Sequence, residues 1–132
     1  MNDAYQSTAL IVDEDDHVAA LLEFMLLRDG YITTRCADGG EASRFIASNP
    51  PVAIVIQELV LPYRDGFELI AQIRRSETWR DVPILVLSSR NVEDEIVRVF
   101  EDGANDYVSK PYSPRELLAR IERLAPAPGV AR

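Results

Sequence analysis

The sequence of 132 residues contains a single cysteine, Cys36, so no disulfide bond can form within the chain. No apolar run approaches the roughly 18 residues that a membrane-spanning helix needs, and the first ten residues lack the basic and then apolar pattern of a signal peptide. Basic residues are in the minority, with 14 Lys and Arg against 22 Asp and Glu and a net charge of −8. These features predict a cytoplasmic protein and argue against membranes and nucleic acids as direct partners, because an acidic surface repels their phosphate groups.

The residues that are present suit one globular domain. Hydrophobic residues make up 47% of the chain and charged residues 27%, which allows a sizeable core beneath a charged surface. A length of 132 residues corresponds to one domain. Residues 126–132 include two prolines and a glycine, which is typical of a tail or the start of a linker. We therefore expect one domain over residues 1–125, followed by such a tail.

Short apolar runs alternate with helical patterns five times along the chain. Strands are expected near residues 9–12, 31–36, 52–56, 84–87 and 106–109. Helices are expected over residues 18–26, 42–46, 67–73, 92–100 and 113–124, where apolar residues recur at helical spacing and Ser113 with Glu116 predicts a capping box. Strands that are apolar throughout are buried on both faces, and parallel strands need crossover connections. The sequence therefore predicts an α/β fold with a doubly wound, five-stranded parallel sheet.

Polar residues follow the apolar runs where the expected strands end. They are the acids at 13–16, then Gln57 and Glu58, then Ser88 and Ser89, and finally Lys110. In an open parallel sheet these strand ends share one edge. Clustered carboxylates repel one another unless a cation such as Mg²⁺ neutralises them. A lysine can neutralise the charge of phosphoryl oxygens, and a hydroxyl group can donate a hydrogen bond to them. The pattern predicts a site that handles a phosphoryl group, and the alternative is that the acids only complement the dipole of the first helix.

Four separate stretches, in order, carry a resemblance to a known family. They are IVDED at 11–15, LVLPYRDGFELI at 59–70, PILVLSS at 83–89 and GANDYVSKPYSPREL at 103–117. Over roughly residues 7–125 the chain resembles the receiver domain of two-component response regulators. The resemblance implies a flavodoxin-like (βα)5 fold with strand order 2-1-3-4-5. It also implies a signalling module rather than an enzyme.

By this resemblance, Asp13 and Glu14 take the positions of the acidic pair that holds Mg²⁺. The backbone carbonyl of Val60 would join them as a third ligand. Glu14 is one methylene longer than the commoner aspartate at its position. The resemblance therefore implies Mg²⁺ as a cofactor, with its affinity left open.

The resemblance also assigns residues that respond to the phosphoryl group. Ser88 takes the hydroxyl position that follows this group, Tyr107 the aromatic switch position, and Lys110 the lysine position. Two alternatives stay open: Ser88 is only a strand-end hydroxyl, and Lys110 forms a structural ion pair with Glu58. The bond between Lys110 and Pro111 resembles one that is often cis in the family.

The chain departs from the family at the phosphoacceptor. Family members carry an aspartate four residues before the proline of the loop, and counting back from Pro62 gives Glu58. Acyl-phosphate formation needs an oxygen in line with the donor, and an extra methylene moves the carboxylate forward. Three interpretations remain. The first is a receiver independent of phosphorylation, which is either inert or partly switched on because Glu58 imitates the phosphorylated state. The others are residual phosphorylation, including on Glu58, and an engineered Asp→Glu exchange in an ordinary Mg²⁺-dependent receiver.

The expected partners are a histidine kinase or phosphotransfer protein, or a downstream effector. Many receivers meet partners through the face formed by the fourth helix, the fifth strand and the fifth helix. The formation of a homodimer through this face stays an open alternative, since Asp106 and Arg120 could form one of the ion pairs used by the transcription-factor subfamily.

A metal-dependent phosphohydrolase that uses Asp13 and Asp15 is the alternative from another functional class, although 132 residues leave no room for a cap domain over the site. A nucleotide- or flavin-binding domain is disfavoured because no glycine-rich motif follows the first strand.

Overall fold

The computed structural model describes residues 7–127. Within them, the strands are β1 (Thr8–Val12), β2 (Ile32–Cys36), β3 (Ile54–Gln57), β4 (Ile84–Ser88) and β5 (Asp106–Ser109). The helices are α1 (Asp16–Arg28), α2 (Gly39–Ser48), α3 (Gly66–Arg75), α4 (Glu93–Glu101) and α5 (Pro114–Leu124). The strands pair in parallel in the order β2-β1-β3-β4-β5, which confirms the predicted fold class. None of these helices is both long and apolar enough to cross a membrane.

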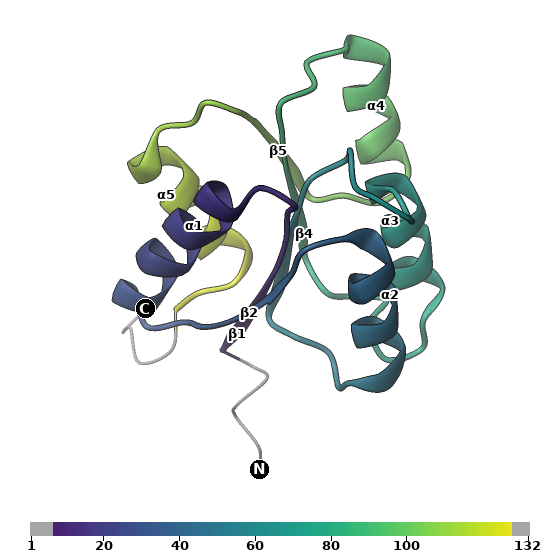
Figure 1. The fold of residues 1–132 in the computed structure, drawn as a ribbon, viewed down its shortest axis with the longest axis horizontal. Coiled ribbons are helices and arrows are strands. Elements are labelled where there is room, and N and C mark those ends of the chain that lie inside the picture. The colour runs from purple at the N-terminus through teal and green to yellow at the C-terminus, as the bar shows by residue number, and fades with distance from the viewer. Residues whose placement is uncertain (1–6, 128–132) are drawn as a thin grey trace.

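Helices cover both faces of the sheet. Figure 1 shows α1 and α5 on one face and α2, α3 and α4 on the other. Successive side chains of a strand point to opposite faces, so each face has a core of its own. Leu10 and Val55 are buried on the side of α2, α3 and α4, whereas Ile11 and Ile56 are buried on the side of α1 and α5. Burial on both sides explains why these strands are apolar without interruption.

The capping box expected from Ser113 and Glu116 at the start of α5 forms only in part. Ser113 caps α5 by accepting a hydrogen bond from the backbone N–H of Glu116. The carboxylate of Glu116 instead accepts hydrogen bonds from Arg120, so it is used within the helix rather than at its start. The reciprocal capping box forms at α3, where Asp65 and Glu68 each accept a hydrogen bond from the other's backbone N–H.

The chain stays packed beyond the predicted domain end at residue 125. Ala125 and Ala127 are both buried in the core that α1 and α5 cover. The hydroxyl of Tyr31, just before β2, donates a hydrogen bond to the carbonyl oxygen of Ala125. The division into a domain and a tail stays a prediction.

Gly39, the first residue of α2, lies against the backbone of the loop between β3 and α3. Its N–H donates to the carbonyl oxygen of Pro62 at 3.0 Å, and a Cβ atom at this position would lie 1.6 Å from the carbonyl oxygen of Arg64. We expect Gly39→Ala to lower the free energy of unfolding, measured by urea denaturation, by about 3 kcal/mol because backbone must move. Gly40→Ala is the matched control: its Cβ would lie 3.2 Å from Oδ1 of the Asp38 side chain, a contact that a shift of a few tenths of an ångström relieves, and its change should stay within about 1 kcal/mol. Equal losses in the two variants would contradict this close approach.

Candidate functional site

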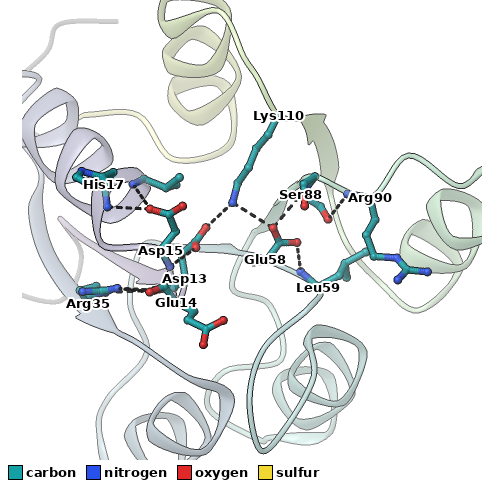
Figure 2. A network of polar contacts seen from close by, with 12 residues as sticks. Asp13, Glu14, Asp15, His17, Arg35, Glu58, Leu59, Ser88, Arg90 and Lys110 are labelled. Carbon is teal, nitrogen blue, oxygen red and sulfur yellow. Dashed lines mark hydrogen bonds and ion pairs between the residues drawn. The ribbon is translucent and has the colours of Figure 1, made fainter.

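The candidate site lies at the carboxyl ends of four strands. Asp13 follows β1, Glu58 follows β3, Ser88 ends β4 and Lys110 follows β5. Asp13, Glu58 and Ser88 are buried, and Lys110 is half-buried. Figure 2 shows the Lys110 side chain reaching across the edge of the sheet to a point between Asp13 and Glu58.

The ammonium group of Lys110 bridges the two buried carboxylates. Its Nζ lies 2.8 Å from Oδ2 of Asp13 and 3.1 Å from Oε1 of Glu58. The carboxylate side chains are only 6% and 7% exposed, so their mutual repulsion would be poorly screened without a cation. Burial disfavours the charge on Lys110, but its hydrogen bonds to Asp13 and Glu58 outweigh this and raise the pKa of Lys110 above its ordinary value. Lys110 is the only lysine in the sequence, and it serves as the cation of this cluster.

Both carboxylate oxygens of Glu58 accept hydrogen bonds. Oε2 accepts from the backbone N–H of Leu59 at 2.7 Å, and Oε1 accepts from Lys110 and, at 3.4 Å, from the backbone N–H of Ser89. Burial raises the pKa of Glu58, but hydrogen bonds from Ser88, Leu59 and Lys110 outweigh it and hold that pKa below its ordinary value. Glu58 therefore carries a negative charge at neutral pH.

The backbone of Glu58 is fixed by the strands and by the start of α3. Its N–H donates to the carbonyl oxygen of Val12 at 3.0 Å. Gln57 is buried and donates from Nε2 to the carbonyl oxygen of Gly66 at 2.9 Å. A Cβ atom on Gly66 would lie 2.5 Å from the carbonyl oxygen of Glu58, so only glycine allows this approach. Gln57 therefore has a structural role beside the site.

The side chains of the two acids proposed as magnesium ligands point in different directions. Asp13 points to Lys110, whereas Figure 2 shows the exposed Glu14 side chain directed away from both. Val60 is 55% exposed in the loop after β3. Across residues 7–127, no group of three or more His, Cys, Asp or Glu side chains is placed to hold a metal ion. The carboxylates of Asp13 and Glu14 are oxygen donors that suit Mg²⁺ chemically, and an ion bound there would share the charge of Asp13 with Lys110. Mg²⁺ as a cofactor therefore stays a prediction.

The two residues at the switch positions contact the same residue of the loop between β4 and α4. The hydroxyl of Tyr107 donates to the carbonyl oxygen of Arg90, and the backbone N–H of Arg90 donates to Oγ of Ser88 at 3.1 Å. Burial raises the pKa of Tyr107, which keeps its hydroxyl protonated as a donor. The peptide bond between Lys110 and Pro111 is cis, as the resemblance implied.

Two arginines near the site are not singled out by the sequence analysis. Arg35 of β2 donates to the carbonyl oxygens of Asp13 and Glu14 at 2.8 and 3.2 Å and pairs with Asp16 at 2.8 Å, which holds the acidic loop after β1 (Figure 2). A basic residue in an expected strand, close to the strand that the acids at 13–16 follow, was a usable signal for Arg35. Arg90 had no such signal, because its role depends on how the loop after β4 is folded.

Comparison with known proteins identifies the family. A family model described as the response regulator receiver domain matches residues 9–122. The chain belongs to this family. The match confirms the resemblance found in the sequence, and it makes the chain a receiver domain of two-component signalling.

Solved receiver structures are similar over nearly the whole domain. A candidate response regulator from Chloroflexus aurantiacus is 38% identical, with a TM-score of 0.83 over 90% of this chain and 97% of that one. The receiver domain of a Francisella response regulator is 27% identical, with a TM-score of 0.82 over 90% and 96%. The receiver domain of a Pseudomonas aeruginosa sensor histidine kinase is 28% identical, with a TM-score of 0.81 over 90% and 97%, and is described with a magnesium ion coordinated in its active site cleft.

The lowered pKa of Glu58 makes the stability of this receiver depend on pH. A carboxyl group whose pKa is lower in the folded than in the unfolded chain stabilises the fold when ionised, and this contribution is lost as the pH falls through the folded pKa. We expect the melting temperature of the wild type to exceed that of Glu58→Gln at neutral pH, with the difference shrinking as the pH falls below the ordinary pKa of a glutamate. Differential scanning fluorimetry across this range measures it. A difference that stays constant down to the lowest pH would contradict the ion pair with Lys110.

Proposed function

We propose that this receiver signals without being phosphorylated, with the Glu58 carboxylate as a permanent charge at the phosphoacceptor position. The observation that carries the proposal is the engagement of both Glu58 oxygens by Lys110, Leu59 and Ser89. An acceptor must present a free oxygen in line with the incoming phosphorus atom. In this chain the same oxygens hold the loops around the site together instead.

The single charge of Glu58 supports a partial conformational bias. A phosphoryl group would bring up to two negative charges and three acceptor oxygens, whereas a carboxylate brings one charge and two oxygens. Driving a two-state equilibrium from 1:99 to 99:1 takes about 5.5 kcal/mol. We therefore infer that Glu58 shifts the equilibrium between the inactive and active conformations only part of the way, and that binding of a partner protein shifts it further.

Magnesium plays a secondary part in this proposal. Asp13, Glu14 and the carbonyl of Val60 are the residues through which Mg²⁺ would bind, in competition with Lys110 for the charge of Asp13. The single positive charge of Lys110 offsets one of the two negative charges of Asp13 and Glu58, so it replaces part of what the ion would supply. We therefore propose that Mg²⁺ binds weakly to this chain.

The output face in this proposal is formed by α4, β5 and α5. Val97 and Phe100 of α4 are 50% and 45% exposed, which offers apolar area to a protein partner in the cytoplasm. Asp106 of β5 is paired within its own chain, with Arg120 at 3.0 Å and Arg123 at 3.2 Å. A homodimer that used Asp106 and Arg120 would have to break these contacts, so we favour a histidine kinase, phosphotransfer or effector protein as the partner.

A comparison of amide NMR spectra of the wild type and Glu58→Gln tests the proposed function. We expect chemical-shift changes that extend from residue 58 through residues 88–90 to Tyr107 and α4. Glu14→Gln is the matched control, since it removes the same charge from an exposed side chain of the same edge. Changes confined to the residues adjoining position 58, or an equal pattern in the control, would refute a conformational role for this carboxylate.

A further inference from the structure

Helix α4 is the least anchored helix of the described chain. The first turns of α1, α2, α3 and α5 are capped by the side chains of Asp15, Asp38, Asp65 and Ser113. At α4 the capping position is Val92, and no side chain within residues 7–127 accepts a hydrogen bond there. Val99 is its only buried residue, whereas α3 buries four. A helix with few buried contacts and an open first turn unfolds locally more easily than its neighbours.

One ion pair holds the start of this helix. Arg90, in the loop before α4, donates from Nε and Nη2 to the two carboxylate oxygens of Glu95 at 2.7 and 2.8 Å. Glu95 lies in the first turn of α4, which places the pair where the side-chain cap is missing. A planar fork on a carboxylate fixes geometry more firmly than a single contact does.

The backbone of the same arginine is tied to the site. Its N–H donates to Oγ of Ser88, and its carbonyl oxygen accepts from the hydroxyl of Tyr107 (Figure 2 shows the Ser88 contact). The preceding residue, Ser89, donates its backbone N–H to Glu58. Arg90 thus joins β4, β5 and α4 one residue away from the Glu58 carboxylate.

We propose that the ion pair between Arg90 and Glu95 is a latch that replaces the missing cap of α4 and couples this helix to Glu58. When the ion pair is formed, α4 moves together with the loop between β4 and α4, which Ser88 and Tyr107 bind through Arg90. When it opens, the first turn of α4 frays without disturbing the rest of the site. The latch stands on its own contacts, and only its coupling to Glu58 rests on the proposed function.

Hydrogen exchange of the α4 amides, measured by mass spectrometry on the full chain, tests the latch. We expect Glu95→Gln to speed exchange in the first turn of α4 about fivefold, at the amides of Glu95 and Ile96 that donate to the carbonyl oxygen of Val92, within the range that a well-formed surface ion pair supports. Glu93→Gln is the matched control, because it also removes a carboxylate from the first turn and weakens the interaction with the helix dipole equally. We expect less than about a twofold change in it. Equal acceleration in the two variants would overturn the latch.

Hydrogen exchange of the Arg90→Ala variant tests the same ion pair from its other partner. It should speed exchange as much as Glu95→Gln does, and the double variant should be no faster than either single variant. The exchanged pair Arg90→Glu with Glu95→Arg should restore part of the protection. Additive effects, with no recovery in the exchanged pair, would show that the two residues act separately and would overturn the proposal.

The coupling to Glu58 is tested by adding Glu58→Gln to these variants. Glu58→Gln should change exchange in α4 of the wild type and leave it unchanged once Arg90 is alanine. An equal change in both backgrounds would overturn the coupling through Arg90. No change in either background, with the Glu95→Gln effect intact, would leave the latch standing and count against the proposed function instead.

Discussion

Replacing Lys110 with methionine should lower the free energy of unfolding by about 3–5 kcal/mol at neutral pH, because it removes one partner from a buried ionic cluster. Asp13 and Glu58 would then face each other with no cation between them, at side chains that are 6% and 7% exposed. Methionine keeps most of the volume of the lysine stem, so the loss reports the charge rather than a cavity. Urea denaturation at neutral and acidic pH measures it.

Two further measurements connect this loss to the carboxylates. Adding Glu58→Gln to Lys110→Met should recover part of the stability, because one of the two facing charges is gone. MgCl₂ should raise the melting temperature of Lys110→Met more than that of the wild type, since the variant lacks its own cation. A loss below about 1 kcal/mol, the value of an exposed pair, would show that Lys110 does not neutralise the site.

Changing Glu58 to aspartate should create a phosphoacceptor in this receiver. The shorter side chain withdraws the carboxylate by one methylene, away from the backbone N–H of Leu59 that now binds Oε2. An oxygen would then be free to attack the phosphorus atom of acetyl phosphate, with acetate as the leaving group. We expect one added phosphoryl group by intact-mass spectrometry after incubation with acetyl phosphate and MgCl₂.

The control for this change is Glu58→Gln, which keeps the length of the side chain and removes the nucleophilic oxygen. It should gain no mass under the same conditions. If Glu58→Asp also stays unmodified, position 58 alone does not explain the loss of phosphotransfer, and the surrounding residues lack the ability as well.

Periodicity in the sequence was sufficient for the fold because it reports burial on the faces of the sheet. The expected strand over residues 106–109 coincides with β5, whereas β3 begins at Ile54 rather than Val52. Val52 is only 5% exposed, so it is part of the buried apolar run, but it does not pair with a neighbouring strand of the sheet. Hydrophobicity cannot distinguish these two situations, since strand pairing depends on the neighbouring chain segment.

The site was harder to predict because its side chains are oriented by partners far away in the sequence. The rule that strand ends share an edge anticipates Asp13, Glu58 and Lys110 at one place. It says nothing of Glu14 pointing outward, or of Arg35, 22 residues from Asp13, holding the acidic loop. These orientations follow from charge partners that only the folded chain brings together.

Whether Glu58 accepts a phosphoryl group is tested most directly by the intact mass of the unaltered chain after incubation with acetyl phosphate and MgCl₂. We expect no added phosphoryl group, because the hydrogen bonds from Lys110, Leu59 and Ser89 hold the longer Glu58 side chain away from the position of an acceptor aspartate. A stoichiometric phosphoryl addition that disappears in Glu58→Gln would contradict this expectation and would establish Glu58 as a working phosphoacceptor.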